Sequence, residues 1–137
     1  MHFFSKCVSM NFPDAVVATK EVLQRHGFSI LAEVDMHKVL RKHLSVDLRP
    51  YAIFCACSLP LAHRAIKADD AIGSMLLCNL VIQEHCEGCV EISVVDPACS
   101  IGTINHVEMI SIAQEMHSIL RELMDDIESV PRLDRAA

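Results

Sequence analysis

Two runs of mostly apolar, β-branched residues in the second half of the chain constrain the fold more than any other feature. They read LLCNLVIQEH (76–85) and CVEISVVD (89–96), and Glu87 and Gly88 stand between Cys86 and Cys89. A two-residue turn containing glycine typically joins two antiparallel strands into a hairpin. The sequence therefore predicts a sheet with at least one antiparallel pair near its C-terminal end.

Strand-like and helix-like segments alternate in the rest of the chain. Strands are expected at residues 2–10, 28–34 and 51–58. Helices are expected after Asn11, after Asp35 and after Ser58, and the last and longest one over roughly 105–130. The helix after Asp35 is expected to carry an apolar stripe, which comprises Met36, Val39, Leu40 and Leu44. The resulting order is β-α-β-α-β-α-β-β-α, which predicts an α/β (α+β) fold. The expected architecture is a two-layer sandwich, with a mixed sheet of about five strands and helices on one face.

Length and charge narrow the classes of function. The 137 residues are expected to form a single domain, residues 1–137. The formal charge is −6, and no cluster of Lys and Arg is present, which argues against nucleic acid as a partner. No apolar run approaches the roughly 20 residues that span a bilayer, and the first residues do not resemble a signal peptide. We therefore expect a cytoplasmic protein with no membrane partner.

The chain is rich in cysteine, with seven in total. Because their number is odd and a reducing compartment disfavours disulfides, most are expected to be small hydrophobic residues in strands. Cys57 differs, since it ends a strand just before the helix that Ser58 opens, where free N–H groups stabilise a thiolate or an anion. The alternative is that Cys57 is a buried packing residue.

The hairpin turn, HCEGC, raises a second possibility. If Glu87-Gly88 is the turn, Cys86 faces Cys89 and Glu84 faces Glu91, so that these four side chains share one face and could bind a metal ion. His85 is expected on the other face. The alternative is that both glutamates are solvated at an exposed turn and both thiols are free and dispensable. We also expect no disulfide between Cys86 and Cys89 in a reducing cell.

Four segments, in order along the chain, resemble the family called domain of unknown function 302. They are GFSILAEVD, PYAIFCACSLPLAHRAI, IGSMLLCNLVIQE and VVDP, and the likeness extends over about residues 12–125. The resemblance implies a compact α/β domain, found mostly in bacteria and archaea, that forms a homodimer. It implies no reaction, because no biochemical role is established for the family.

Two motifs of that family can be placed on the chain. The first is a cysteine, then Asn-Pro, then an alanine five positions after the cysteine, and it corresponds here to residues 57–62. The second is Leu-Leu-Pro-Cys-Asn, which corresponds to residues 75–79. Both cysteines are present, as Cys57 and Cys78, but Leu59 and Leu77 stand where the family has proline. If the prolines shape a pocket, the pocket of this chain differs.

These observations lead to two hypotheses about function. The first is a homodimeric, non-enzymatic module that binds a small ligand or metal ion at a thiol-lined pocket of Cys57, Ser58, Cys78 and Asn79. The second is a protein of sulfur transfer or redox exchange that uses the Cys57 thiol. The sequence names no cofactor. The long helix also favours a dimer, because its apolar stripe is broader than one small sheet requires; the stripe comprises Met109, Ile112, Ala113, Met116, Ile119, Leu120, Leu123 and Ile127.

Overall fold

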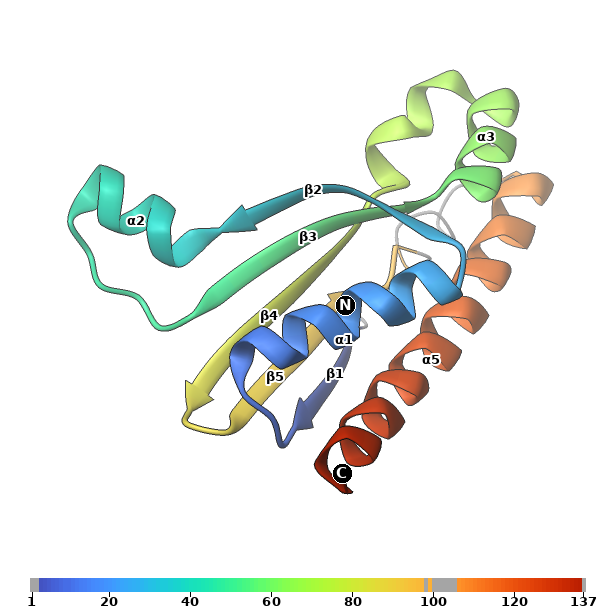
Figure 1. Ribbon diagram of the computed structural model, residues 1–137. Coiled ribbons are helices and arrows are strands. Elements are labelled where there is room, and N and C mark those ends of the chain that lie inside the picture. The colour runs from blue at the N-terminus through green and yellow to red at the C-terminus, as the bar shows by residue number, and fades with distance from the viewer. Residues whose placement is uncertain (1–2, 98, 100–105, 137) are drawn as a thin grey trace.

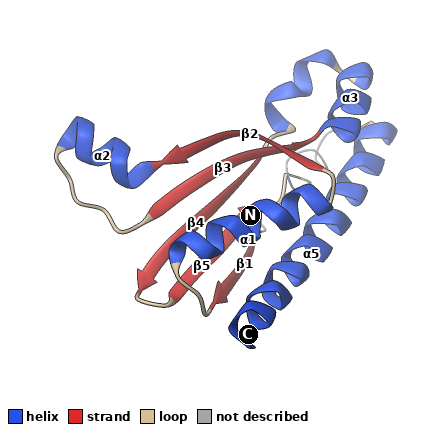
Figure 2. Ribbon diagram, viewed as in Figure 1, coloured by secondary structure: helices blue, strands red, loops and turns tan. Residues whose placement is uncertain are grey.

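The computed structural model describes residues 3–97, 99 and 106–136. Its elements follow the predicted order, and Figure 2 shows the strands running through one sheet. In chain order they are β1 (Phe3–Val8), α1 (Phe12–Arg25), β2 (Phe28–Asp35), α2 (Met36–Leu44), β3 (Tyr51–Ser58), α3 (Leu59–Ala68), the 3₁₀ helix η1 (Asp70–Met75), β4 (Cys78–Cys86), β5 (Cys89–Val95) and α5 (Val107–Ala136).

The sheet contains five strands among the described residues, in the order β1-β5-β4-β3-β2. Every neighbouring pair is antiparallel, so the expectation of a mixed sheet is wrong in this respect. A parallel neighbour would require a helix that returns the chain to the start of the preceding strand. Instead, α2 lies beyond the end of β2 and α3 lies beyond the end of β3. Each of the strands that follow, β3 and β4, therefore begins beside the end of the strand before it (Figure 1).

The helix boundaries follow local signals in the sequence. The Asn11 side chain accepts a hydrogen bond of 2.9 Å from the backbone N–H of Asp14, and it caps the first turn of α1. Asp35 caps α2 in the same way, with an acceptor distance of 3.1 Å to the N–H of Lys38. Gly27, at φ 81°, follows α1 and turns the chain into β2. These signals explain why the predicted element order is confirmed.

One face of the sheet is covered by α1 and α5 (Figure 1). Along most of β3, β4 and β5, residues that point to this face are buried and alternate with less buried residues that point to the opposite face. This pattern is expected of a sheet that is covered on one side. Nearly all of the apolar stripe of α5 is buried within the single chain, and only Ile119 is partly buried. The stripe is therefore not an argument for a second copy, contrary to the expectation from its width.

The opposite face of the sheet is open, because no described helix covers it. The residues that point to it include Phe3 on β1, Val95 on β5, and the partly buried Val81 and Ile53 on β4 and β3. Phe3 is 62% exposed and Val95 is 47% exposed. We call these four residues the open-face patch.

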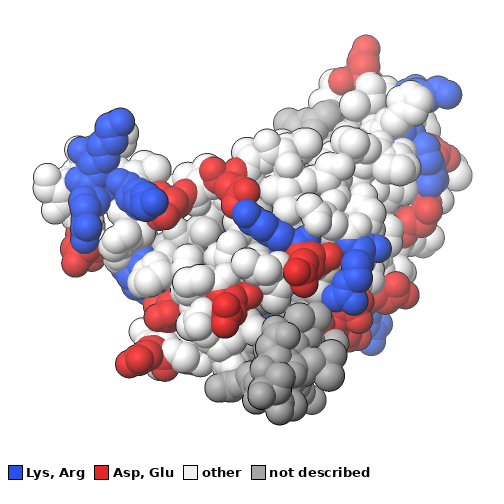
Figure 3. All heavy atoms as spheres, viewed as in Figure 1, with Lys and Arg blue, Asp and Glu red and all other residues white. Residues whose placement is uncertain are grey.

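The segment of residues 31–50, here called the α2 arm, extends away from the helical layer (Figure 1). None of its residues is buried, so the predicted apolar stripe of α2 packs on no core. Lys and Arg side chains gather at the end of the arm (Figure 3). Arg41 is partly neutralised there by Asp47, at 2.6 Å. No helix among the described residues is long and apolar enough to cross a membrane.

Candidate functional site

The residues of the predicted thiol pocket lie together where β3 meets α3. In the antiparallel pairing of β3 with β4, Cys78 is opposite Ala56 and Asn79 is opposite Cys55. Cys57 is the next residue of β3, so it lies diagonal to Cys78. The pairing of the two strands therefore places Cys57 and Cys78 at neighbouring positions, while a ligand pocket between them stays a prediction.

These residues differ in how far solvent reaches them. Cys78 is fully buried, while Cys57 and Ser58 are only 4% and 6% exposed, and Asn79 is exposed. Ser58 precedes α3, but its side chain makes no capping hydrogen bond. The arrangement is a buried thiol pair with one exposed amide beside it.

Burial controls the protonation of both thiols. It raises the pKa of Cys57, and the neighbouring Cys55 raises it further. Burial together with the nearby Asp96 raises the pKa of Cys78 to about 12. The α3 N-terminus does not offset this cost of desolvation, so both groups are neutral thiols at neutral pH.

The hairpin differs from its predicted register. Cys86 does lie opposite Cys89, as expected. A bulge between Glu84 and Cys86, however, shifts the pairing by one residue, so Glu84 faces Val90 and the prediction that it faces Glu91 is wrong. The expected set of Cys86, Cys89, Glu84 and Glu91 depended on that pairing. In the part of the chain that the structure describes, no three Cys, His, Asp or Glu side chains are arranged to hold a metal ion.

The bulge builds a polar network on the open face instead. Gln83 is the residue that lies opposite Glu91, and it donates a hydrogen bond of 3.3 Å to the carboxylate. His85 Nε2 lies 3.0 Å from the same carboxylate oxygen, and the Ser5 hydroxyl donates to the other oxygen at 2.9 Å. His85 therefore reaches the face of Glu91, and its predicted placement on the other face is wrong. Arg49 extends the network by donating to Gln83 at 2.6 and 3.0 Å.

Sequence reasoning missed a pair that connects β5 to α5. Asp96 is 1% exposed at the end of β5, and its carboxylate lies 2.6 Å from Nδ1 of His117. The His117 ring also lies 5.5 Å from the ring of Phe4, measured between centroids. A lone histidine on a helix gives no sequence signal of this contact, because the partner is 21 residues away in the chain.

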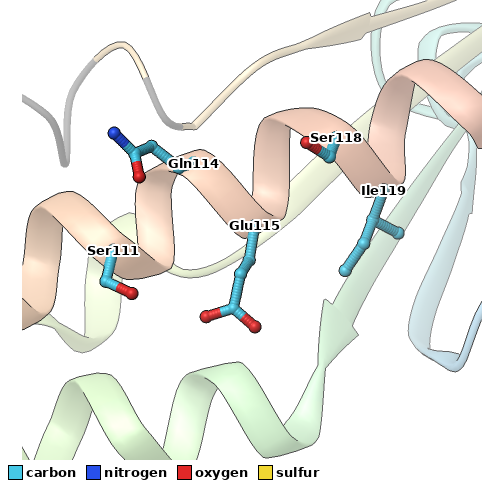
Figure 4. A pocket seen from close by; sticks show the side chains of 5 residues that line it. All are labelled: Ser111, Gln114, Glu115, Ser118 and Ile119. Atoms are coloured by element: carbon cyan, nitrogen blue, oxygen red, sulfur yellow. The ribbon is translucent and has the colours of Figure 1, made fainter.

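Two shallow cavities lie along α5. One, of about 390 Å³, is lined by residues that project in several directions from that helix (Figure 4); they are Ser111, Gln114, Glu115, Ser118 and Ile119. The other, of about 290 Å³, lies between Arg64, Lys67 and Ala68 of α3 and Glu108 of α5. Arg64 binds one glutamate of each cavity, Glu108 at 2.9 Å and Glu115 at 2.6 Å. Neither cavity includes the Cys57 cluster.

Comparison with known proteins supports the fold. A crystal structure of an uncharacterised conserved DUF302 protein from Bacillus stearothermophilus has a TM-score of 0.82 to this chain at 22% sequence identity. The similarity covers 93% of this chain and 99% of the other. No match was found among curated proteins. The family described as Domain of unknown function DUF302 matches residues 4–127. Because this match spans nearly the whole length, the chain belongs to the DUF302 family.

Proposed function

We propose that this protein is a homodimeric, non-enzymatic module that binds a small ligand or metal ion, and that two copies associate through the open-face patch. The observation that carries the proposal is the open face of the sheet. Phe3 and Val95 lie opposite each other on β1 and β5 and are about half exposed or more. Val81 and Ile53 lie opposite each other on β4 and β3. A second copy would remove this apolar surface from water, which is favourable.

The proposed ligand site lies at the end of the same face, around Asn79. The Asn79 side chain offers both a hydrogen-bond donor and an acceptor. Cys57 and Cys78 are buried close to it and, as neutral thiols, add no charge to the site. A second copy seated on the open-face patch would partly enclose this position, since Val81 is two residues further along β4.

The alternative hypothesis, in which Cys57 transfers sulfur or exchanges electrons, is less well supported. Such chemistry requires a thiolate near neutral pH. The pKa of Cys57 is raised by burial, and its side chain is only 4% exposed. Both properties favour a structural thiol.

Sedimentation equilibrium at micromolar concentration tests the proposal. The wild-type protein is expected to sediment as a dimer, and Val95→Lys as a monomer, because the lysine places a charge in the open-face patch. Val17→Lys is the matched control, since Val17 is 55% exposed on α1 and Val95 is 47% exposed. A monomeric wild type, or equal effects of the two substitutions, would contradict the proposed association.

Ligand binding is tested separately on the protein as purified. Native mass spectrometry and elemental analysis would detect a bound small molecule or metal ion. We expect Asn79→Ala to lose it and Gln83→Ala, further along β4, to retain it. Retention by Asn79→Ala would place the ligand elsewhere.

A further inference from the structure

The two cysteines of the hairpin turn, Cys86 and Cys89, lie opposite each other and are not part of the proposed ligand site. Cys86 ends β4 and Cys89 begins β5, and they are paired directly across the turn. Gly88, at φ 78°, adopts a left-handed conformation that favours glycine, and this conformation closes the turn. Within the described strand pairings, they are the two cysteines that face each other directly.

The geometry of the pair suits a covalent link. Residues directly opposite each other in antiparallel strands have Cα atoms roughly 4.5–5.5 Å apart. A disulfide requires Cα atoms about 4.4–6.8 Å apart, so the backbone need not move far. The neighbouring Cys89 raises the pKa of Cys86, as expected of two thiols that lie close together.

Accessibility separates this pair from the other neighbouring thiols. Cys86 is exposed and Cys89 is partly exposed, whereas Cys57 and Cys78 are both buried. A small oxidant in solution can therefore reach the hairpin turn but not the cluster beside α3. The turn also lies at the opposite end of β5 from Val95, so association through the open-face patch leaves it accessible.

We propose that Cys86 and Cys89 are a site of reversible oxidation, at which a low-molecular-weight disulfide of the glutathione type closes a disulfide across the β4–β5 turn. The thiolate of one cysteine attacks the small disulfide, forms a mixed disulfide and releases one small thiol. The other cysteine loses its proton and attacks the protein sulfur of that mixed disulfide, which releases the second small thiol. The protein loses two protons and two electrons, and the small disulfide gains them to become two thiols.

The surroundings set the rate and the reversibility of this exchange. The hydrogen bond to Cys89 and the nearby Glu84 raise the pKa of Cys86, so its thiol remains protonated at neutral pH. Exchange proceeds through the thiolate, and closure should therefore accelerate as the pH rises. Exposed disulfides are also reduced more readily than buried structural ones. The site is consequently suited to switching rather than to permanent cross-linking.

Intact-mass spectrometry in mixtures of reduced and oxidised glutathione tests this site. The wild-type protein is expected to lose about 2 Da on closure and to regain it with excess reduced glutathione. Peptide mapping should place the disulfide between Cys86 and Cys89. In Cys86→Ser and in Cys89→Ser, no second thiol can complete the exchange, so each should retain one bound glutathione. Two variants are used so that poor folding of one does not decide the result.

Cys7→Ser is the matched control, because Cys7 is an exposed cysteine on the neighbouring strand β1. It should close the Cys86–Cys89 disulfide as the wild type does. Two outcomes would overturn the proposal. One is a wild type that holds glutathione on Cys86 or Cys89 as persistently as the single variants. The other is a disulfide that maps to different cysteines or joins two chains.

Discussion

At the scale of single residues, burial decides what the cysteines can do. Cys57 and Cys78 are buried and their pKa values are raised, whereas Cys7 and Cys86 are exposed. The position of Cys57 before a helix suggested a reactive thiol, because sequence position reveals the nearby N–H groups. It does not reveal the cost of desolvation, which depends on the strands and helices that pack around the sulfur.

A brief pulse of iodoacetamide should therefore modify Cys7 and Cys86 well before Cys57 and Cys78. Alkylation requires access to the sulfur, which the buried pair lacks, whereas Cys7 and Cys86 are exposed, although the pKa of Cys86 is also raised. Peptide mass spectrometry after the pulse provides the measurement, and unfolding in urea, which should equalise the rates, is the control. Faster labelling at Cys57 than at Cys86 would restore the sulfur-transfer hypothesis.

The Glu91 carboxylate predicts a dependence of stability on pH. Its hydrogen bonds from His85 and then Ser5 hold its pKa below the usual value. The contribution to the free energy of unfolding is therefore present above the unfolded pKa of about 4.3, and it is lost as the pH falls through the lower folded value.

Substitution Glu91→Gln should reduce the loss of stability between about pH 6 and about pH 3 by less than roughly 1 kcal/mol, as for other partly exposed pairs. Urea unfolding at several pH values measures this difference. Glu87→Gln, at the exposed turn, should leave the wild-type profile unchanged. An identical profile for Glu91→Gln would show that the network does not stabilise the carboxylate.

At the scale of elements, the apolar stripes of α5 and α2 differ in whether they are buried. The stripe of α5 lies in the core, whereas no residue of α2 is buried. Periodicity predicted both helices and both stripes correctly, because it reports the spacing of side chains along a helix. It does not report which surface the rest of the chain covers, and this depends on the long-range arrangement of the sheet.

Truncation of one leucine on each helix tests this difference. Leu120→Ala on α5 should lower the free energy of unfolding by about 2–5 kcal/mol, because it leaves a cavity in the core. Leu44→Ala on α2 should change it by less than about 0.5 kcal/mol, since Leu44 is 65% exposed. Chemical denaturation of both variants makes the comparison. Similar losses would mean that α2 packs against a second surface.

The hairpin shows which features of an element can be predicted from the sequence and which cannot. The Glu-Gly turn predicted two antiparallel strands and the Cys86–Cys89 pairing, both of which the structure has. The bulge before Cys86 changed the partner of Glu91 and brought His85 to it. A bulge adds one residue to one strand without changing the apolar pattern enough to be recognised. For this reason the predicted metal-binding set of Cys86, Cys89, Glu84 and Glu91 does not form among the described residues.

At the scale of the whole molecule, the fold is asymmetric about its sheet. The helices α1 and α5 cover one face, and the other face carries the open-face patch at one end and the Glu91 network nearer the hairpin turn. The sequence was sufficient to predict the element order, because caps, glycines and periodicity are local. The antiparallel arrangement of all five strands and the open face depend on how the elements pack, and local signals do not carry that information.

Hydroxyl-radical footprinting as a function of protein concentration tests most directly the claim that two copies associate through the open-face patch. Phe3 and Leu44 are matched reporters, at 62% and 65% exposed, on the open-face patch and on the α2 arm. Oxidation of Phe3 should fall as the concentration rises through the association range, while oxidation of Leu44 stays constant. Constant oxidation of Phe3 in a protein that has become dimeric would contradict the account.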